Sequence, residues 1–498
     1  MTYSVIVLAI FGIAVILVGA WASRNSMPTA EDYFLGGRSI GAIATFFGMA
    51  ATQLSGFVFL GQIAISYMGG VGTIAQLLGG IIQVPLLYYL FRYMNDMGKK
   101  HGYITQADYL SARFDNSKFM TIVPSVLGIV AITAGHFVIQ FMSTGYIFQI
   151  MTGGKLPYSF GIIYTAIIVA VVVLIGGFRA TAWADIVLGG WMLLALLSIP
   201  FIVLGATGMG FSEAVGSFVT NFPQHASIPG PLGQWTPQMI FSWIIVMGGF
   251  IMYPHMFLRA YSARDKKLFS ITAFFWIPVM VFSVGIVLVF GSLIHLVWAN
   301  PGIAQVTPDQ LLIHLITQFT SSWVAPFILA GALAAIVSTL IGNVLGLSSL
   351  VMNDIVKKFG KKDMEQKKIV LWSRVVVAIA TIVAVIMSLA EFNTITQIFV
   401  SANGIIVLFL VPIVGGLIWR RMNKHGAVYG LLVGELTLFW LTYGPKELGG
   451  GSMANPSYLG FLPSVWALFV TIIVTVVVSL ATAPQASFPK KTDSSLLQ

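Results

Sequence analysis

Apolar runs long enough to cross a lipid bilayer fill most of the chain, and they restrict the fold more than any other feature. A helix needs about 20 consecutive apolar residues to cross the hydrocarbon layer. The apolar–polar alternation of a membrane β-barrel is missing from these runs. The sequence therefore predicts an all-α integral membrane protein with about 13 transmembrane helices. We expect the spans at residues 3–22, 41–69, 72–94, 119–150, 157–176, 183–207, 239–261, 268–297, 322–352, 369–389, 393–419, 427–443 and 458–481.

Composition excludes the main soluble classes. Only 8% of the 498 residues are charged, whereas a soluble domain carries roughly 25%. This low share excludes a soluble enzyme and a nucleic-acid-binding protein. The net charge of +10 does not indicate nucleic-acid binding, because it comes from short basic clusters between apolar runs. Cysteine is absent, which excludes disulfides and thiolate metal sites.

The basic residues predict an orientation in the cell membrane. Of the 26 Lys and Arg residues, 24 fall in alternate connections between the spans, which the positive-inside rule assigns to the cytoplasm. The two exceptions are Lys155 and Lys446. The N-terminus is then outside and the C-terminus inside. The cytoplasmic connections hold Arg24 and Arg38; Arg92, Lys99, Lys100, Arg113 and Lys118; Arg179; Arg259, Arg264, Lys266 and Lys267; the basic residues of 357–374; Arg420, Arg421 and Lys424; and Lys490 and Lys491.

Two spans carry helix-breaking residues in the middle of apolar sequence. The second span contains the polar sequence TQLSG, residues 52–56, and the seventh contains Gly248–Gly249 and Pro254–His255. Interrupted helices at matching positions of two halves are typical of transporters with inverted repeats. Close helix packing at the glycines is the simpler alternative.

Four stretches, in order, resemble one family. They are EDYFLGGRS (31–39), DYLSARF (108–114), GGFRATAWAD (176–185) and AAIVSTL (334–340). From about Glu31 to the twelfth span the chain resembles the sodium/solute symporter family, closest to its pantothenate, monocarboxylate and proline branches. The resemblance implies a LeuT-type fold with two five-helix inverted repeats, at 41–207 and 237–419. Residues 1–40 then form a peripheral helix and cytoplasmic loop, 208–236 an extracellular loop, 420–483 two peripheral helices, and 484–498 a cytoplasmic tail.

Oxygen donors in the ninth span suggest a sodium site. Ala335, Ser338 and Thr339 lie at i, i+3 and i+4, on one face of a helix. A carbonyl and two hydroxyls are hard ligands of the kind that hard cations prefer, although such hydroxyls also bond back to their own helix. The resemblance implies that these three residues belong to the shared sodium site of the family, completed by the backbone carbonyls of Ala51 and Leu54.

The resemblance also suggests why one sodium is expected. Some family members bind a second sodium through hydroxyls one turn further on and an Asp that matches Asp185. Here Ile341 and Gly342 stand at the hydroxyl positions, so we expect one sodium. Asp185 is either a residue of the ion path or a structural partner of Arg179 or of a helix N-terminus.

The substrate pocket is expected around the two breaks. Gln53 stands where the proline transporters of the family carry Asp, so the pocket lacks a fixed negative charge and favours a neutral or anionic solute. No Lys or Arg is expected at mid-membrane, so a carboxylate would rely on hydroxyls and helix N-termini. The candidates are Gln53, Ser55, Gly56, Gln140, Tyr146, Trp243, Gly249, Tyr253, Pro254, His255 and Asn403.

These observations predict a sodium-coupled symporter that imports a small organic solute, a monocarboxylate or a pantothenate-like carboxylate, by alternating access. The expected partners are sodium, the solute and the lipid bilayer, without nucleic acid, and the protein is expected to act as a monomer. One alternative is a symporter for proline or another amino acid. Others are proton coupling through His136 and His255, and a sensor with a transporter fold. An enzyme is not expected, because no acid/base pair, metal cluster or nucleotide loop is evident.

Overall fold

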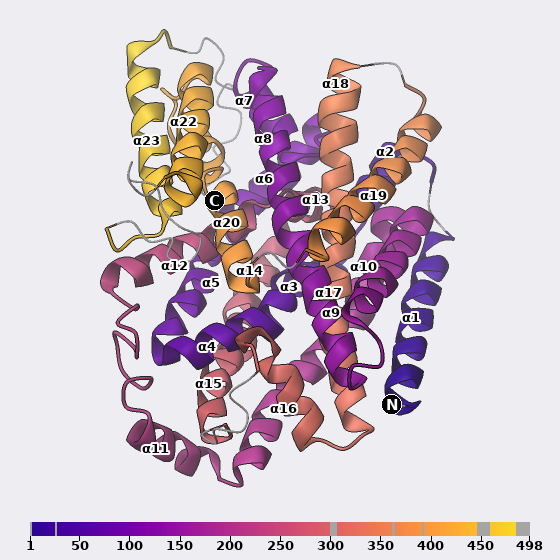
Figure 1. Cartoon of the computed structure of the whole chain (residues 1–498). Helices are drawn as coiled ribbons and strands as arrows, with labels where there is room; N and C mark the ends of the chain where they lie inside the picture. Colours follow the sequence, from indigo (N-terminus) through magenta and orange to yellow (C-terminus); the bar gives the residue numbers. More distant parts are fainter. Residues whose placement is uncertain are drawn as a thin grey trace.

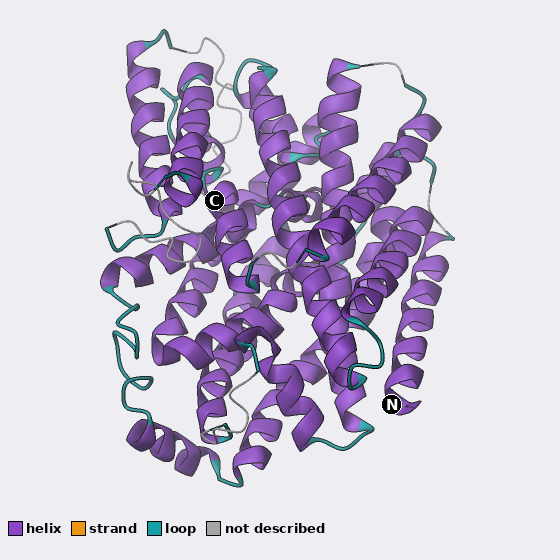
Figure 2. Cartoon of the chain, viewed as in Figure 1, coloured by secondary structure: helices purple, strands orange, loops and turns teal. Residues whose placement is uncertain are grey.

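The computed structural model describes residues 2–24, 27–298, 306–360, 364–390, 393–445 and 459–484. Within these ranges the chain is helical, and extended pairing is limited to one bridge between Ile40 and Ala263. Figure 2 shows helices joined by loops of different lengths. The predicted all-α architecture is confirmed, and the predicted tail after Pro484 lies outside the described residues.

The first half of the chain forms helices that follow the expected apolar runs. Several are continuous but pass through short π-helical or 3₁₀ turns, denoted η. The elements are α1 (Thr2–Ser23), α2 (Ala30–Leu35), η1 (Gly36–Arg38), α3 (Ala42–Gln53), η2 (Phe57–Gln62), α4 (Ile63–Gly69), η3 (Gly70–Thr73), α5 (Ile74–Pro85), η4 (Leu86–Leu90), α6 (Phe91–His101), α7 (Gln106–Arg113), α8 (Phe119–Val130), η5 (Ala131–Phe137), α9 (Val138–Met151) and α10 (Tyr158–Thr207).

The second half repeats this pattern and ends with a helix pair. Its connections contain short helices that the sequence reading treated as loops. The elements are α11 (Phe211–Asn221), α12 (Pro237–Gly249), η6 (Phe250–Met252), α13 (Pro254–Ser262), α14 (Lys267–Met280), η7 (Val281–Gly285), α15 (Ile286–Leu293), η8 (Ile294–Leu296), η10 (Pro308–Gln310), α16 (Leu311–Phe319), α17 (Val324–Ser349), η11 (Leu350–Val356), α18 (Lys357–Phe359), α19 (Gln366–Ser388), α20 (Ile395–Val407), η12 (Val411–Gly415), α21 (Gly416–Ile418), α22 (Lys424–Tyr443) and α23 (Pro463–Ala481).

The described residues contain 10 helices long and apolar enough to cross a membrane, or 11 if the bent pair α12–α13 counts as one span. Two of them, Phe57–His101 and Tyr158–Thr207, contain 45 and 50 residues, about twice the length that a bilayer requires. Each includes a glycine with positive φ, Gly70 at 68° and Gly177 at 53°. The count of 13 stays a prediction; two crossings by each long stretch would produce it.

Helix α17 lies at the centre of the molecule. Every residue from Ile328 to Leu350 is buried, and α17 packs against α3, α9, α10, α13 and α19. Small residues allow this close packing; a Cβ at Gly331 would collide with Ala195 of α10. By contrast, α1 exposes Ile10, Ile13 and Leu17, and Figure 1 shows it at the edge of the bundle.

The two ends of the bundle differ in the elements that they carry. Figure 1 shows α2, α7 and α18 at one end, and α11, α16 and the start of α1 at the other. Of these helices, α7 contains Arg113 and α18 contains Lys357 and Lys358. The predicted orientation in the membrane stays a prediction.

Helices α22 and α23 form a closely packed pair, visible at the upper left of Figure 1. One face of α22 carries a glycine at every fourth position, and hydroxyl side chains of α23 fill the space that a Cβ would need. This glycine ladder lets the two backbones approach closely. The three contacts are Gly426 with Ser479, Gly430 with Thr475, and Gly434 with Thr471.

Candidate functional site

The first helix break separates α3 from η2. Leu54 has an extended backbone (φ −87°, ψ 92°), and the carbonyl of Ser55 accepts from the N–H of Val58 at 3.0 Å as the next helix begins. The N–H of Gly56 donates to Oε1 of Gln140 at 2.8 Å. A Cβ at Gly56 would lie 2.5 Å from the hydroxyl of Ser143. The glycine therefore lets α9 close over the break, and Gln140 satisfies a donor that the broken helix leaves free.

The second break lies between Gly249 and Pro254. Tyr253 has an extended backbone (φ −61°, ψ 142°) where η6 ends and α13 begins, and the two helical segments are bent by 48°. Proline disfavours helical geometry in the preceding residue, which explains the position of the break. Gly249 lies against α20, where a Cβ would be 2.5 Å from Cγ2 of Val407.

Three of the predicted sodium ligands meet where α3 contacts α17. The hydroxyl oxygen of Thr339 lies 2.9 Å from the carbonyl oxygen of Ala335 and 3.2 Å from that of Ala51, and all three residues are fully buried. A hydroxyl has one hydrogen and can donate to only one of these carbonyls at a time. A small hard cation among the three oxygens would satisfy all of them.

The other two predicted ligands lie next to this group. Leu54 is fully buried at the break itself, three residues after Ala51. Ser338 donates its hydroxyl hydrogen to Oδ1 of Asp185 at 2.5 Å, rather than to the oxygens around Thr339. The assignment of all five residues as sodium ligands stays a prediction.

Asp185, in α10, forms a buried ion pair that the sequence reading did not anticipate. Its Oδ2 lies 2.6 Å from Nη1 of Arg259, and the two side chains are 0% and 3% exposed. Arg179 pairs with Asp32 at 2.7 Å instead, so the alternative that joined Arg179 to Asp185 is wrong. The assignment of Arg259 to a loop is also wrong, because Arg259 lies within α13. Its burial is possible because the carboxylate of Asp185 is paired with its guanidinium.

Polar atoms around the two breaks lack hydrogen-bond partners among the described residues. They include Oε1 of Gln53, the hydroxyl of Tyr253 and Oδ1 of Asn403, and all three residues are at most 4% exposed. Most buried polar atoms in proteins are hydrogen-bonded. Three such atoms, from α3, the second break and α20, are therefore available to a polar solute.

His136 joins the second break from the neighbouring helix. Its ring centroid lies 4.3 Å from that of Tyr253 and 5.9 Å from that of His255. Its Nδ1 lies 3.4 Å from Nδ2 of Asn343 in α17. The site thus includes a cluster of aromatic and imidazole rings next to the central helix.

Two of the predicted pocket residues have aromatic neighbours outside the breaks. The ring of Tyr146 lies 5.3 Å from that of Tyr158 at the start of α10, and the ring of Trp243 lies 6.3 Å from that of Trp235. A pocket role for Tyr146 and Trp243 stays a prediction.

Two residues belong to the site but were not among those predicted. Asn343 lies four residues after Thr339 and therefore on the same helix face, a spacing that could have been read from the sequence. Arg259 carried no such signal, because a basic residue near the end of an apolar run is normally assigned to the adjoining loop. Its partner Asp185 lies 74 residues earlier in the chain.

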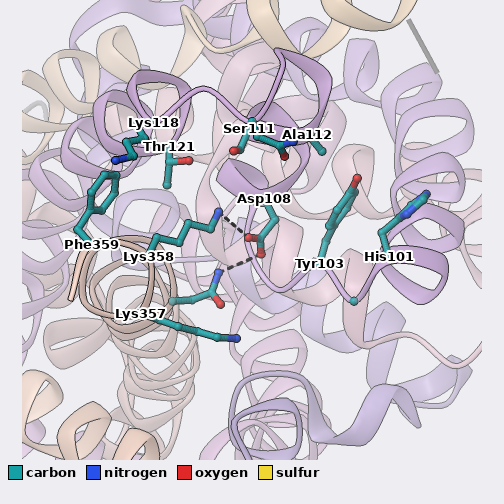
Figure 3. Close-up of a pocket in the computed structure, with 13 residues that line it drawn as sticks. His101, Tyr103, Asp108, Ser111, Ala112, Lys118, Thr121, Lys357, Lys358 and Phe359 are labelled. Carbon is teal, nitrogen blue, oxygen red and sulfur yellow. Dashed lines mark hydrogen bonds and ion pairs between the residues drawn. The ribbon is translucent and has the colours of Figure 1, made fainter. Parts of the chain in front are cut away.

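A second polar cluster lies at the end of the molecule that carries α7 and α18 (Figure 3). Oδ1 of Asp108, in α7, lies 2.8 Å from Nζ of Lys358, and its Oδ2 accepts from Asn353 at 3.0 Å. These residues line a cavity of about 540 Å³. Nearby, Asp354 accepts from Thr105 at 2.6 Å. The cluster connects α7 to the continuation of α17.

The charge of Asp108 is stabilised in this cluster. Burial raises the pKa of its carboxyl, but the ammonium of Lys358 and hydrogen bonds from Lys358 and from the backbone N–H groups of Thr105 and Ile104 outweigh burial. The pKa of Asp108 therefore lies below its usual value of 3.8. The carboxylate stays ionised at neutral pH.

Two helices are broken inside an apolar interior. Carbonyl and hydroxyl oxygens lie at one break, and polar atoms without partners among the described residues lie around both. This arrangement is typical of secondary transporters built on broken helices. A model of the sodium:solute symporter family matches residues 33–434. The chain belongs to the sodium:solute symporter family.

Relatives and a solved structure agree with this family. The osmoregulated proline transporter OpuE of Bacillus subtilis is 27% identical over 488 residues, which cover 95% of this chain and 94% of the relative. The sodium/pantothenate symporter of Escherichia coli is 27% identical over 478 residues, covering 93% and 92%. A Na⁺-coupled sialic acid symporter, solved in a substrate-bound outward-open state, has a TM-score of 0.80 at 19% identity and covers 97% and 98%.

The comparisons confirm the family prediction and the LeuT-type fold. The protein is a membrane transporter and not an enzyme, and sodium is its coupling ion. The sodium ligands, the pocket residues and the repeat boundaries remain predictions.

Proposed function

We propose that this protein imports a small organic carboxylate, a monocarboxylate or a pantothenate-like acid, together with one sodium ion by alternating access. The observation that carries the proposal is the group of oxygens from Ala51, Ala335 and Thr339. It joins the first broken helix to α17 beside Gln53. An ion bound there would order the same break that contributes to the solute pocket.

The charge of the pocket favours a carboxylate. Gln53 is uncharged, and the buried guanidinium nearby, that of Arg259, is paired with Asp185. The N-terminus of α13 begins at Pro254, next to Tyr253, and helix N-termini attract anions. The hydroxyl of Tyr253 supplies a hydrogen-bond donor. Together these groups would accept a carboxylate without a basic side chain.

A proline or other amino-acid symporter is the second candidate. It is favoured by the relatives, several of which are named as proline transporters. An amino acid would bring an ammonium group as well as a carboxylate, and Oε1 of Gln53 and Oδ1 of Asn403 are free to accept from it. The amide acceptors would hold that ammonium less strongly than a carboxylate would.

The test is uptake into proteoliposomes that hold the purified protein under an imposed ion gradient. Lactate, pantothenate and proline serve as labelled solutes, and the inward gradient is of sodium, of potassium or of protons. We expect a sodium gradient alone to drive accumulation of lactate or pantothenate. Proline accumulation instead would favour the second candidate. Uptake that follows the proton gradient without sodium would contradict the proposal.

The ratio of sodium to solute is measured in the same vesicles. One sodium with a monovalent carboxylate makes the cycle electroneutral, so a membrane potential set by potassium and valinomycin should leave the rate unchanged. Accumulation that rises with an inside-negative potential would require more than one sodium and would contradict the expected ratio.

A further inference from the structure

We propose that the cavity beside Asp108 and Lys358 binds the phosphate headgroup of an anionic phospholipid. The cavity lies at the end of the molecule that carries α7 and α18, which the basic residues predict to be cytoplasmic. The inference is independent of the solute and of the ion, because the residues that line the cavity include none of the predicted pocket residues or sodium ligands.

The walls of the cavity carry an excess of positive charge. The lining residues include three lysines, Lys118, Lys357 and Lys358, and one carboxylate, that of Asp108. Nζ of Lys358 lies 2.8 Å from this carboxylate, whereas Lys118 and Lys357 are paired with no carboxylate among the described residues. In Figure 3 these two lysines lie on opposite sides of the Asp108–Lys358 pair. Two positive charges are therefore available to an anion.

The cavity lies where two apolar helices end. The candidate membrane spans Phe119–Met151 and Val324–Phe359 begin and end beside it. Lys118 directly precedes the first span, and Lys357 lies two residues before the end of the second. Long basic side chains near the ends of membrane helices extend to the bilayer surface. We therefore expect both ammonium groups at the depth of the lipid phosphates.

Exposed aromatic rings next to the lysines favour a lipid over a soluble phosphate compound. The side chain of Phe119 is 65% exposed and that of Phe359 is 40% exposed. Nζ of Lys118 lies 6.0 Å from the centroid of the Phe359 ring. A soluble anion would leave both rings in water, whereas the acyl chains of a lipid would cover them, which is favourable for apolar surface.

The cavity has the size and the donors that a phosphate headgroup requires. Its volume of about 540 Å³ lies within the range of about 300–1,000 Å³ that is typical of small-ligand sites. Ammonium groups form strong, charge-assisted hydrogen bonds with phosphate oxygens, and the hydroxyls of Ser111 and Thr121 line the same walls (Figure 3). Basic pockets between membrane helices on the cytoplasmic side are known binding sites for anionic headgroups.

A bound headgroup would connect two parts of the chain. Lys118 lies in the connection between α7 and α8, and Lys357 lies in α18. The Asp108–Lys358 pair already joins α7 to α18, and a phosphate between the two free lysines would add a second link beside this pair. The lipid should therefore stabilise the folded protein, because a ligand that binds only the folded state raises Tm.

The experiment measures the Tm of the purified protein in detergent micelles that contain increasing amounts of dioleoyl phosphatidylglycerol. Dioleoyl phosphatidylcholine, which has the same acyl chains but no net charge, is the lipid control. Glycerol 3-phosphate, which has the phosphate but no acyl chains, is the soluble control. We expect the Tm of the wild type to rise with phosphatidylglycerol and to change little with either control.

The variant Lys118→Gln with Lys357→Gln should lose most of this rise. A basic residue near an anionic surface contributes about fivefold to affinity, so the loss of both should weaken lipid binding roughly 30-fold. Arginine at both positions should preserve the rise, because it keeps the charge. The matched control is Lys367→Gln with Lys368→Gln, which removes two exposed lysines at the start of α19, outside the cavity, and should respond to the lipid like the wild type.

Three results would overturn the inference. The first is an equal rise of Tm with the two lipids in the wild type, and the second is an equal rise with phosphatidylglycerol in the cavity variant and the α19 control. The third is a rise with glycerol 3-phosphate as large as that with phosphatidylglycerol, which would assign the cavity to a soluble phosphate compound. If the glutamine variant is too unstable to measure, native mass spectrometry of the wild type decides, because it should retain phosphatidylglycerol in preference to phosphatidylcholine; equal retention would contradict the proposal.

Discussion

At the scale of single residues, the hydroxyl of Thr339 lies between two helices and has one hydrogen to donate. It lies within hydrogen-bonding distance of Ala335, in its own helix, and of Ala51, in the broken helix α3. Without an ion, one carbonyl at a time receives that hydrogen. A cation bound among these oxygens, as proposed, would satisfy the remaining one.

We expect Thr339→Val to weaken sodium binding with little effect on folding. Valine keeps the shape of threonine but lacks the ligand oxygen, and loss of one ligand should lower sodium affinity by roughly tenfold, which corresponds to about 1.4 kcal/mol. Sodium titration of the purified protein measures the change. Thr381→Val is the matched control, because the hydroxyl of Thr381 bonds within its own helix to Val377 at 2.8 Å. An equal loss of sodium affinity in both variants would contradict the assignment.

Gln53 is expected to determine solute preference while leaving sodium binding intact. Gln53→Asp adds a negative charge in a buried pocket, where it repels a carboxylate more strongly than in water, so uptake of a monocarboxylate should collapse. Gln53→Ala should cost one hydrogen bond, about 0.5–1.5 kcal/mol, or roughly a two- to tenfold loss of affinity. Solute titrations of both variants test this. Equal affinities in the two variants would mean that Gln53 does not contact the solute.

The sequence predicted residues whose role depends on local spacing. Ala335, Ser338 and Thr339 share one face because helix periodicity fixes it, and the break at Leu54 follows from polar residues in an apolar run. The pairing of Asp185 with Arg259 could not be predicted in this way. It depends on how α10, α13 and α17 pack, and that packing is a property of the tertiary structure.

At the scale of helices, the cluster around Asp108 connects α7 to the helix that carries the proposed sodium oxygens. Asp108 caps the start of α7 and pairs with Lys358. The 15 positions from Thr339 to Asp354 correspond to about 22 Å along a helix. A continuous helix, Val324–Phe359, therefore runs from this end to the proposed ion site.

Asp108→Asn should lower Tm modestly. The carboxylate charge of Asp108 pairs with Lys358 and strengthens the helix cap. Its loss in the variant is expected to lower the free energy of unfolding by about 1–2 kcal/mol. Because the pKa of Asp108 is lowered in the folded state, its stabilisation is present above pH 3.8 and is lost as the pH falls through the folded-state pKa. At neutral pH the Tm of the variant should therefore lie below that of the wild type.

Glu31→Gln is the control for this measurement. Glu31 pairs with Arg38, but its side chain is 55% exposed, and exposed pairs contribute little. Its Tm should match that of the wild type. A Tm of Asp108→Asn that also matches the wild type would show that the cluster does not stabilise α7.

Helix boundaries show where sequence prediction reached its limit at this scale. The apolar runs predicted the principal helices, but α11 and α16 lie in connections that were read as loops. Their amphipathic segments are too short for a span, so the criterion of apolar length passed over them. The π-helical turns, such as η5, which contains His136, depend on packing between helices and leave no simple pattern in the sequence.

At the scale of the whole molecule, the distribution of basic residues predicts the orientation. The chain has no cysteine, so single cysteines can be introduced without background. Lys155→Cys should react with a membrane-impermeant maleimide in intact cells, because Lys155 is predicted to lie outside. Lys368→Cys, at the exposed start of α19, should react only after the membrane is permeabilised. The opposite pattern would reverse the predicted topology.

The glycine ladder between α22 and α23 has a consequence for mutational scanning. Any side chain larger than hydrogen at Gly426, Gly430 or Gly434 collides with a hydroxyl of α23. Scoring every substitution by growth on the transported solute should thus reveal intolerant positions here as well as around the sodium oxygens. The two groups are distinguished by protein abundance, which falls for the ladder variants because the helix pair fails to assemble, and which stays high for variants that lose only ion binding.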